Sequence, residues 1–167
     1  MGIPDWTIDP MSVLTTQQLP LDLQRSMTSH SLIAGQLLIQ QGESAQAIYF
    51  VESGRIRLVS FTEEQIITHY FVEAGESFAE TVLFSETYSC TAIAEVDSRV
   101  SVVPKQLFLE SLHTSSELTE VYIRQLIQRF LSLKTLLELR SIRSARERIM
   151  RYLILHVQPN GVTINLQ

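Results

Sequence analysis

Cysteine is nearly absent from this sequence, which has Cys90 as its only one among 167 residues. A single cysteine cannot form an intrachain disulfide, so we expect a reducing compartment. It also cannot supply a CxxC metal site or a cysteine-ligated cluster. The four histidines show no metal-ligand spacing, and we expect them on the surface or in the core; they are His30, His69, His113 and His156. The sequence therefore predicts no bound metal and no cofactor.

A long apolar run is also missing. No stretch approaches the roughly 20 apolar residues that a membrane-spanning helix needs. Residues 1–20 include Asp5 and Asp9 and lack the apolar segment of a secretory signal. We therefore expect a cytoplasmic protein with no membrane partner.

Positive charge is in the minority, with a formal net charge of −5 at pH 7 and a pI near 5.3. Nucleic-acid binding needs a basic field, so the chain by itself is not expected to bind DNA. One basic cluster could contact DNA, form hinge salt bridges or be a solvated helix face, and we expect the last. Its members are Arg140, Arg143, Arg146, Arg148 and Arg151.

Short apolar runs separated by turn signals fill residues 31–103. This pattern predicts an antiparallel β-roll or barrel and not βαβ units. The last two strands are expected at 89–95 and 99–103, joined by a turn at Asp97-Ser98. Residues 1–30 are expected to form a lead-in with short helical turns.

Helical patterns follow the strands. Pro104 should start a helix, where its missing N–H is harmless. A long helix is expected from Ser116 to Arg143, with apolar residues at the 3-4-3-4 spacing of a coiled-coil seam. We call these residues the apolar strip: Ile123, Leu126, Phe130, Leu133 and Leu137. The strip predicts a homodimer, against the alternative of one amphipathic helix buried in its own domain.

A second apolar stripe on the same helix points elsewhere, so one stripe could cover the roll while the other meets a partner. Its members are Ile127, Leu131, Leu136 and Leu139. Ser144 and Glu147 have capping-box spacing, which predicts another helix from Ser144 to about His156. A turn at 159–161 and a short strand at 162–166 should follow.

Residues 38–54 carry the most specific motif of the chain. Two aliphatic residues precede Gly42-Glu43, and the apolar run 48–51 precedes Gly54. The two glycines suit turns with positive φ, and the apolar run should be a strand buried on both faces. The stretch resembles the first signature of the cyclic-nucleotide-binding domain family. That resemblance implies a jelly-roll-like antiparallel β-roll, a mainly β fold with added helices, followed by a long C-terminal dimerisation helix.

The family's second signature aligns without gaps with residues 78–84 and 88–92. In nucleotide-binding members, a short helix presents backbone N–H groups to the cyclic phosphate, an arginine pairs with that phosphate, and a glutamate holds the ribose. The resemblance places the ligand-binding positions of a degenerate site at Phe78, Ala79, Glu80, Thr81, Cys90 and Thr91. Here Ala79 replaces the first glycine, Val82 the second small residue, and Cys90 the arginine. Glu80 is either a ligand contact or a helix-end carboxylate that bonds local N–H groups.

The C-terminal part resembles the Crp/Fnr branch of the family, with Arg148-Ile149 in the helix that follows the dimer helix. In that branch two hydroxyl-bearing residues touch the purine. The positions that align with them here are Leu133 and Lys134, so those hydroxyl contacts are absent. Some Crp/Fnr members bind haem, but the histidine spacing here gives no support for it. Cys90 could be a redox switch, although a half-buried strand residue is the simpler interpretation.

The resemblance implies the effector-sensing and dimerisation region of a transcription regulator, with residues 1–30 as lead-in, 31–112 as roll, 113–143 as dimerisation helix and 144–167 leading to a helix-turn-helix domain. DNA would be bound only through that domain, which this chain does not contain. The effector would be an unknown small molecule and not cyclic AMP. The alternative is a stand-alone ligand-binding or protein-interaction module. No nucleophile–base pair or glycine-rich phosphate loop appears, so we expect no enzyme.

Overall fold

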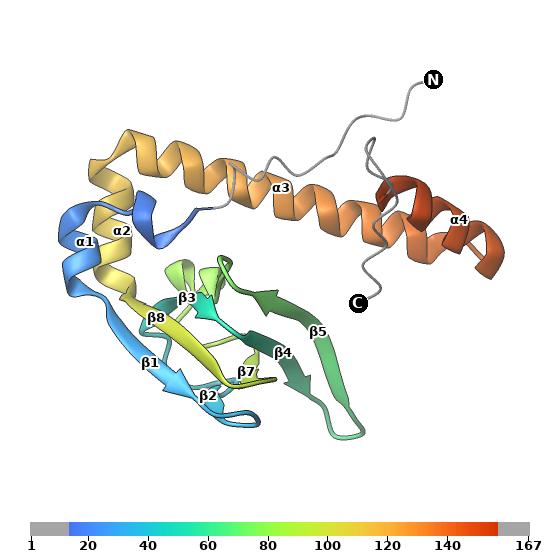
Figure 1. Ribbon diagram of the computed structural model, residues 1–167, viewed down its shortest axis with the longest axis horizontal. Helices are drawn as coiled ribbons and strands as arrows, with labels where there is room; N and C mark the ends of the chain where they lie inside the picture. Colours follow the sequence, from blue (N-terminus) through green and yellow to red (C-terminus); the bar gives the residue numbers. More distant parts are fainter. Residues whose placement is uncertain (1–13, 157–167) are drawn as a thin grey trace. The chain divides into compact units, whose positions relative to one another are not determined.

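The computed structural model describes residues 14–156 of the chain (Figure 1). The turn and strand expected after residue 158 lie outside the described residues, as does the first part of the lead-in. The described residues divide into two compact units, one up to Gln125 and one from Leu126 onward. The long helix α3 (Ser116–Ser141) contributes residues to both.

The first unit is built from two four-stranded antiparallel sheets. One has the order β1-β8-β3-β6, with bounds Thr28–Leu32, Ser98–Pro104, Ala47–Ser53 and Ser77–Phe78. The other has the order β2-β7-β4-β5, with bounds Leu37–Ile39, Thr91–Ala94, Arg55–Phe61 and Ile66–Glu73. The predicted antiparallel roll followed by a long helix is confirmed.

Strand bounds differ from the sequence expectations by a few residues. β1 begins at Thr28, before residue 31, because Thr28 pairs with Val102 and extends the ladder along β8. β7 begins at Thr91 and not at Ser89, since the residues just before it belong to the loop that follows a short helix. Ser98 already belongs to β8, where its hydroxyl accepts the N–H of Arg55 across the neighbouring turn.

The centre of the roll is strand β3. All four residues from Ile48 to Val51 are buried, as the sequence predicts for a strand covered on both faces. Gly42 and Gly54 both have positive φ, 87° and 84°. At Gly54 a side chain would also collide with the backbone of Asp97 and Ser98, so the β3–β4 turn requires glycine for two reasons.

Helices precede, interrupt and follow the strands of the roll. The short helices are η2 (Thr16–Gln18), α1 (Leu21–Ser26) and η3 (Glu80–Phe84). Pro104 is the N-cap of α2 (Lys105–Thr114), where its lack of an N–H costs nothing. α3 ends at Ser141, two residues before the expected Arg143. α4 (Ala145–His156) starts as predicted, with the N–H of Glu147 donating to Ser144 Oγ at 3.3 Å.

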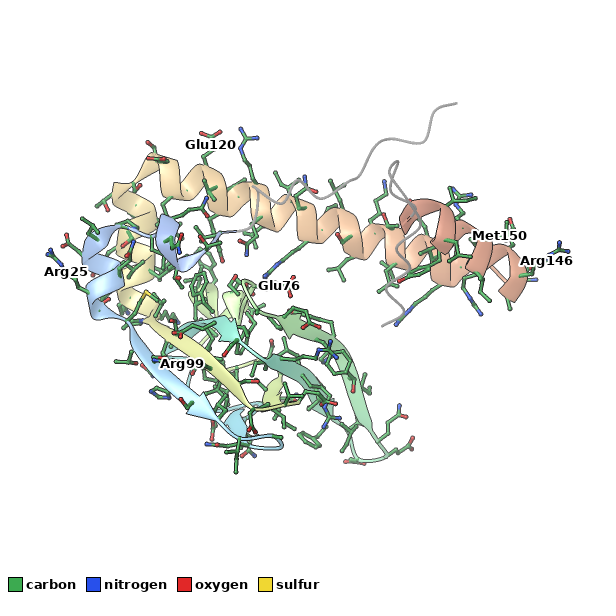
Figure 2. All side chains as sticks on the ribbon, in the orientation of Figure 1. Arg25, Glu76, Arg99, Glu120, Arg146 and Met150 are labelled. Carbon is green, nitrogen blue, oxygen red and sulfur yellow. The ribbon has the colours of Figure 1, made fainter. Side chains whose placement is uncertain are left out.

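The start of α3 packs on the core of the roll. Leu118 and Tyr122 are buried there, and the Tyr122 ring meets Phe108 of α2 edge-on at 5.3 Å. Glu120 points to the opposite side, away from the strands, and pairs with Arg124 at 2.6 Å (Figure 2). The helix residues in this core therefore lie before Leu126, and the sequence analysis had not singled them out.

Candidate functional site

Residues 77–91, here called the cassette segment, run from β6 through η3 to the start of β7. Ala79 is the N-cap of η3 and has a left-handed backbone, φ 69° and ψ 24°. Val82 and Leu83 are buried in the core and fasten the inner side of η3 to the roll. Phe84 at the end of η3 is 93% exposed. η3 is therefore anchored by apolar packing on one side and open on the other.

Glu80 takes part in a chain of hydrogen bonds that reaches the long helix. Ser77 Oγ donates to Glu80 Oε1 at 2.7 Å, and Gln125 Nε2 of α3 donates to Ser77 Oγ at 2.8 Å. The N–H of Leu14 donates to Gln125 Oε1 at 2.7 Å. We call these three bonds the hydrogen-bond relay. The sequence analysis had left two roles for Glu80, and a bond to the hydroxyl of Ser77 was neither of them.

Cys90 is the residue that the signature resemblance aligns with the phosphate-binding arginine. Its side chain is partly exposed, and the pKa of its thiol is raised, mainly by burial, with the Glu80 carboxylate also raising it. A hydrogen bond from Ser89 acts in the opposite direction on this pKa. The thiol is therefore neutral at pH 7, and it lacks the thiolate character on which redox switching depends.

Two of the predicted ligand-binding residues lie inside the core. Phe78 has no exposed surface, and its ring stacks on Tyr49 at 5.1 Å. Thr91 is also fully buried, and its Oγ1 accepts the N–H of Gln41 at 2.9 Å. Both side chains already have their partners within the fold. Of the six predicted positions, Ala79, Glu80, Thr81 and Cys90 keep some surface, and Thr81 Oγ1 lies 3.3 Å from Ser89 Oγ.

Tyr88 joins the cassette segment to β3. Its hydroxyl lies 3.2 Å from that of Tyr49 and accepts the N–H groups of Gln46 and Ala47 at 3.3 and 3.2 Å. Burial, together with the bond to Tyr88, raises the pKa of Tyr49, so the Tyr49 phenol is a neutral hydrogen-bonding group. These contacts fix the loop before β7 by side-chain packing.

Three basic residues of β4 and α2 already have partners within the fold. Arg57 Nε lies 3.0 Å from Glu95, and Arg55 Nε lies 2.7 Å from Glu73. Lys105 Nζ donates to the carbonyl of Ser85 at 2.8 Å. None of these three contacts brings a cation to Cys90.

The apolar strip of α3 is exposed on this single chain. Its five residues have between 40% and 67% of their surface accessible, with Phe130 and Leu137 at the upper end. The second stripe does not form one uniform face, since Leu139 is buried whereas Ile127 and Leu136 are exposed. At 100° per residue the strip is centred about a quarter of a turn from the face that carries Leu118, Tyr122 and Gln125. On α3, Leu118 and Tyr122 thus belong to the core of the roll, whereas the strip residues are exposed.

Residues 14–156 hold no group of three or more His, Cys, Asp or Glu side chains arranged to bind a metal ion. In the same part of the chain, no helix combines the length and the apolar character needed to cross a membrane. Two surface hollows of about 340 and 240 Å³ are lined by residues outside the cassette segment.

Comparison with known proteins agrees with this geometry. The model of the cyclic nucleotide-binding domain family matches residues 29–115, more than half of the chain. No curated protein matches the sequence. Among solved structures, the sensor domain of the transcriptional regulator DNR from Pseudomonas aeruginosa is 25% identical with a TM-score of 0.59, over 65% of this chain and 78% of that one.

Two longer structures are also similar. DNR from Pseudomonas aeruginosa is 25% identical with a TM-score of 0.60, over 95% of this chain and 67% of that one. The catabolite activator protein of Thermus thermophilus is 25% identical with a TM-score of 0.59, over 69% of this chain. This chain spans 55% of the length of that activator. DNR and the catabolite activator protein are regulators of the Crp/Fnr type.

Proposed function

Because this chain belongs to the cyclic nucleotide-binding domain family, we propose that it is the effector-sensing and dimerisation region of a Crp/Fnr-type transcription regulator. In this proposal residues 31–112 sense, residues 113–143 dimerise, and residues 144–167 lead to a DNA-binding domain. The observation that carries it is the combination of a cassette segment on the roll with an exposed apolar strip on α3. The protein works in the cytoplasm and has no catalytic activity of its own.

The effector is a small molecule other than cyclic AMP. Ala79, Glu80, Thr81 and Cys90 are the positions open to it, and the only formal charge among them is the Glu80 carboxylate. A buried cyclic phosphate needs a paired cation. A neutral ligand with hydroxyl or amide donors suits these side chains better, because such donors can bond to Glu80 without an unpaired negative charge.

Dimerisation follows from the exposure of the strip. Phe130, Leu133 and Leu137 repeat at coiled-coil spacing and leave more than half of their surface accessible. Apolar area gains about 25 cal/mol per Å² on burial, so pairing two such helices is favourable. The second copy of the same helix supplies a strip of the same spacing by symmetry.

Native mass spectrometry of the chain purified from cytoplasmic extract tests the proposal. We expect a dimer carrying a low-mass adduct that is released on denaturation. Glu80→Ala should reduce the adduct, whereas Glu86→Ala, a change to an exposed carboxylate of the same segment, should not. A monomer without adduct would contradict both parts of the proposal.

The alternative function is a stand-alone ligand-binding or protein-interaction module without a role at DNA. In such a module, the cassette segment would bind the ligand and the exposed apolar strip would bind the partner protein. The coding sequence beyond Gln167 discriminates between the two: a helix-turn-helix pattern there supports the regulator, and a stop codon supports the module.

A further inference from the structure

Gln125 joins α3 to the cassette segment through bonds whose direction is fixed. The backbone N–H of Leu14 can only donate and the Glu80 carboxylate accepts, so the Gln125 carbonyl must face Leu14 and its NH₂ must face Ser77. The Ser77 hydroxyl then accepts from Gln125 and donates to Glu80. Within the relay, each group thus has a fixed role as donor or acceptor.

The relay is buried where it meets the helix. Gln125 is 3% and Ser77 1% exposed, so water does not readily replace a lost partner there. An unsatisfied buried amide or hydroxyl is costly, and a change at one end therefore affects the next bond. Gln125 also directly precedes Leu126, the second residue of the apolar strip.

The other end of the relay closes a strained turn. The bond from Ser77 to Glu80 spans Ala79, the one non-glycine residue with positive φ among residues 14–156. Left-handed alanine is disfavoured, so this backbone persists because surrounding contacts hold it. Loss of the Ser77–Glu80 bond removes one of these contacts and leaves the turn free to change.

We propose that Ser77 and Gln125 are positioning residues that couple the state of the cassette segment to α3 at the start of the apolar strip. A ligand that takes over Glu80 would withdraw the acceptor of Ser77 and, through Gln125, loosen the hold on the helix and on Leu14. The regulatory meaning rests on the proposed function. The coupling itself is a property of the unliganded chain and can be measured without any effector.

Backbone amide hydrogen exchange measured by NMR tests the coupling, with the Leu14 N–H as the sensor. Leu14 and Glu80 are joined through two intervening side chains, so a purely local role of Glu80 would leave Leu14 unchanged. We expect Glu80→Ala and Ser77→Ala to speed exchange at Leu14 by about five- to tenfold, the factor for one lost hydrogen bond. Glu86→Ala and Gln106→Ala, which change exposed residues, should leave it unchanged.

Coupling must also act in reverse, since linkage between two sites is reciprocal. Gln125→Ala should therefore speed exchange of the η3 amides, notably Val82, whose N–H bonds to the carbonyl of Ala79. Where Glu80→Ala disturbs folding, Glu80→Gln provides a milder variant, because a neutral amide oxygen is a weaker acceptor for Ser77.

Gln125→Glu tests the direction of the bonds. At neutral pH two carboxylates would compete for the one hydroxyl hydrogen of Ser77, which raises the pKa of the introduced glutamate above its usual value of about 4.3. The loss of the hydrogen bond to Ser77 destabilises the variant above that raised pKa. This loss is reversed as the pH falls through the pKa, because a protonated carboxyl donates to Ser77 as the amide does. Leu14 exchange, corrected for its intrinsic pH dependence, should slow towards that of the parent chain on acidification.

Unchanged Leu14 exchange in both Glu80→Ala and Ser77→Ala would overturn the coupling, as would a Gln125→Glu variant that behaves like the parent chain at pH 7. Neither result bears on whether an effector exists. Conversely, an empty cassette segment in the mass-spectrometric experiment would remove the regulator proposal and leave the measured coupling in place.

Discussion

The Arg57 guanidinium lies 3.0 Å from the Glu95 carboxylate, an ion pair on the side of β4 opposite to the buried Ile56 and Leu58. Arg57 lies on β4, which pairs with β7, the strand that begins just after Cys90. In this structure its partner is Glu95, so it does not supply the cation that is missing at Cys90. A phosphate at η3 would therefore meet the Glu80 carboxylate and a neutral thiol.

We predict that cyclic AMP and cyclic GMP bind more weakly than about 10 μM in isothermal titration calorimetry. Removal of one member of a buried ion pair costs roughly 3–5 kcal/mol, or two to four orders of magnitude in affinity. Cys90→Arg restores the cation and should tighten binding at least about tenfold, whereas Cys90→Ser should not. Binding of the parent chain tighter than this limit would show that another group holds the phosphate.

The long helix should determine the oligomeric state. Phe130→Asp combined with Leu133→Asp places two charges on each copy of the apolar strip and should yield monomers in light scattering at micromolar concentration. Ser132→Asp with Thr135→Asp adds the same charge to the same helix away from the strip and should leave the dimer intact. A monomeric parent chain under these conditions would refute the dimer.

DNA binding should be absent or weak for this chain. Its net charge is −5, and the arginines between Arg140 and Arg151 are exposed around the α3–α4 junction and along α4. Such a cluster supports at most a salt-sensitive association. We expect no sequence-selective shift in a gel at physiological salt, and any weak association should disappear on doubling the salt. A shift that survives competitor DNA would contradict the prediction.

The strands and the long helix could be predicted because their signals are local. The apolar run of β3, the positive φ of Gly42 and Gly54, and the Ser144 cap each depend on a few neighbouring residues. The ends of β1 and β7 could not be predicted in this way, because a strand extends as far as its pairing partner allows. Thr28 joins β1 only because Val102 lies opposite.

The sequence suggested a position for the candidate site but could not give its details. The family signature located Glu80 and Cys90, but it could not show that Phe78 and Thr91 are fully buried. Gln125 went unnoticed because it is polar and 48 residues from Ser77. A signal was present, since Leu118, Tyr122 and Gln125 share one helix face, and a glutamine in phase with buried residues must find partners there.

Ala79 offers a prediction on stability. Its left-handed backbone costs an alanine about 1–2 kcal/mol, whereas glycine adopts it freely, although glycine loses more chain entropy on folding. Ala79→Gly should therefore raise the free energy of unfolding by about 0.5–1 kcal/mol, the surplus of the first effect over the second. The measurement is the urea midpoint, with the slope of the transition unchanged.

Ala34→Gly is the matched control, because Ala34 lies in an exposed turn and does not have positive φ. At position 34, glycine relieves no strain and only increases the conformational entropy of the unfolded chain. The free energy of unfolding should therefore fall slightly. The Ser77–Glu80 bond helps to keep the backbone at Ala79 in its strained left-handed conformation. Glycine adopts this conformation without strain, so the bond should matter less for the turn in Ala79→Gly. Glu80→Ala should consequently cost less stability in the Ala79→Gly background than in the parent chain, a non-additivity that a double-mutant cycle measures. Equal costs in the two backgrounds would show that the turn and the bond are independent.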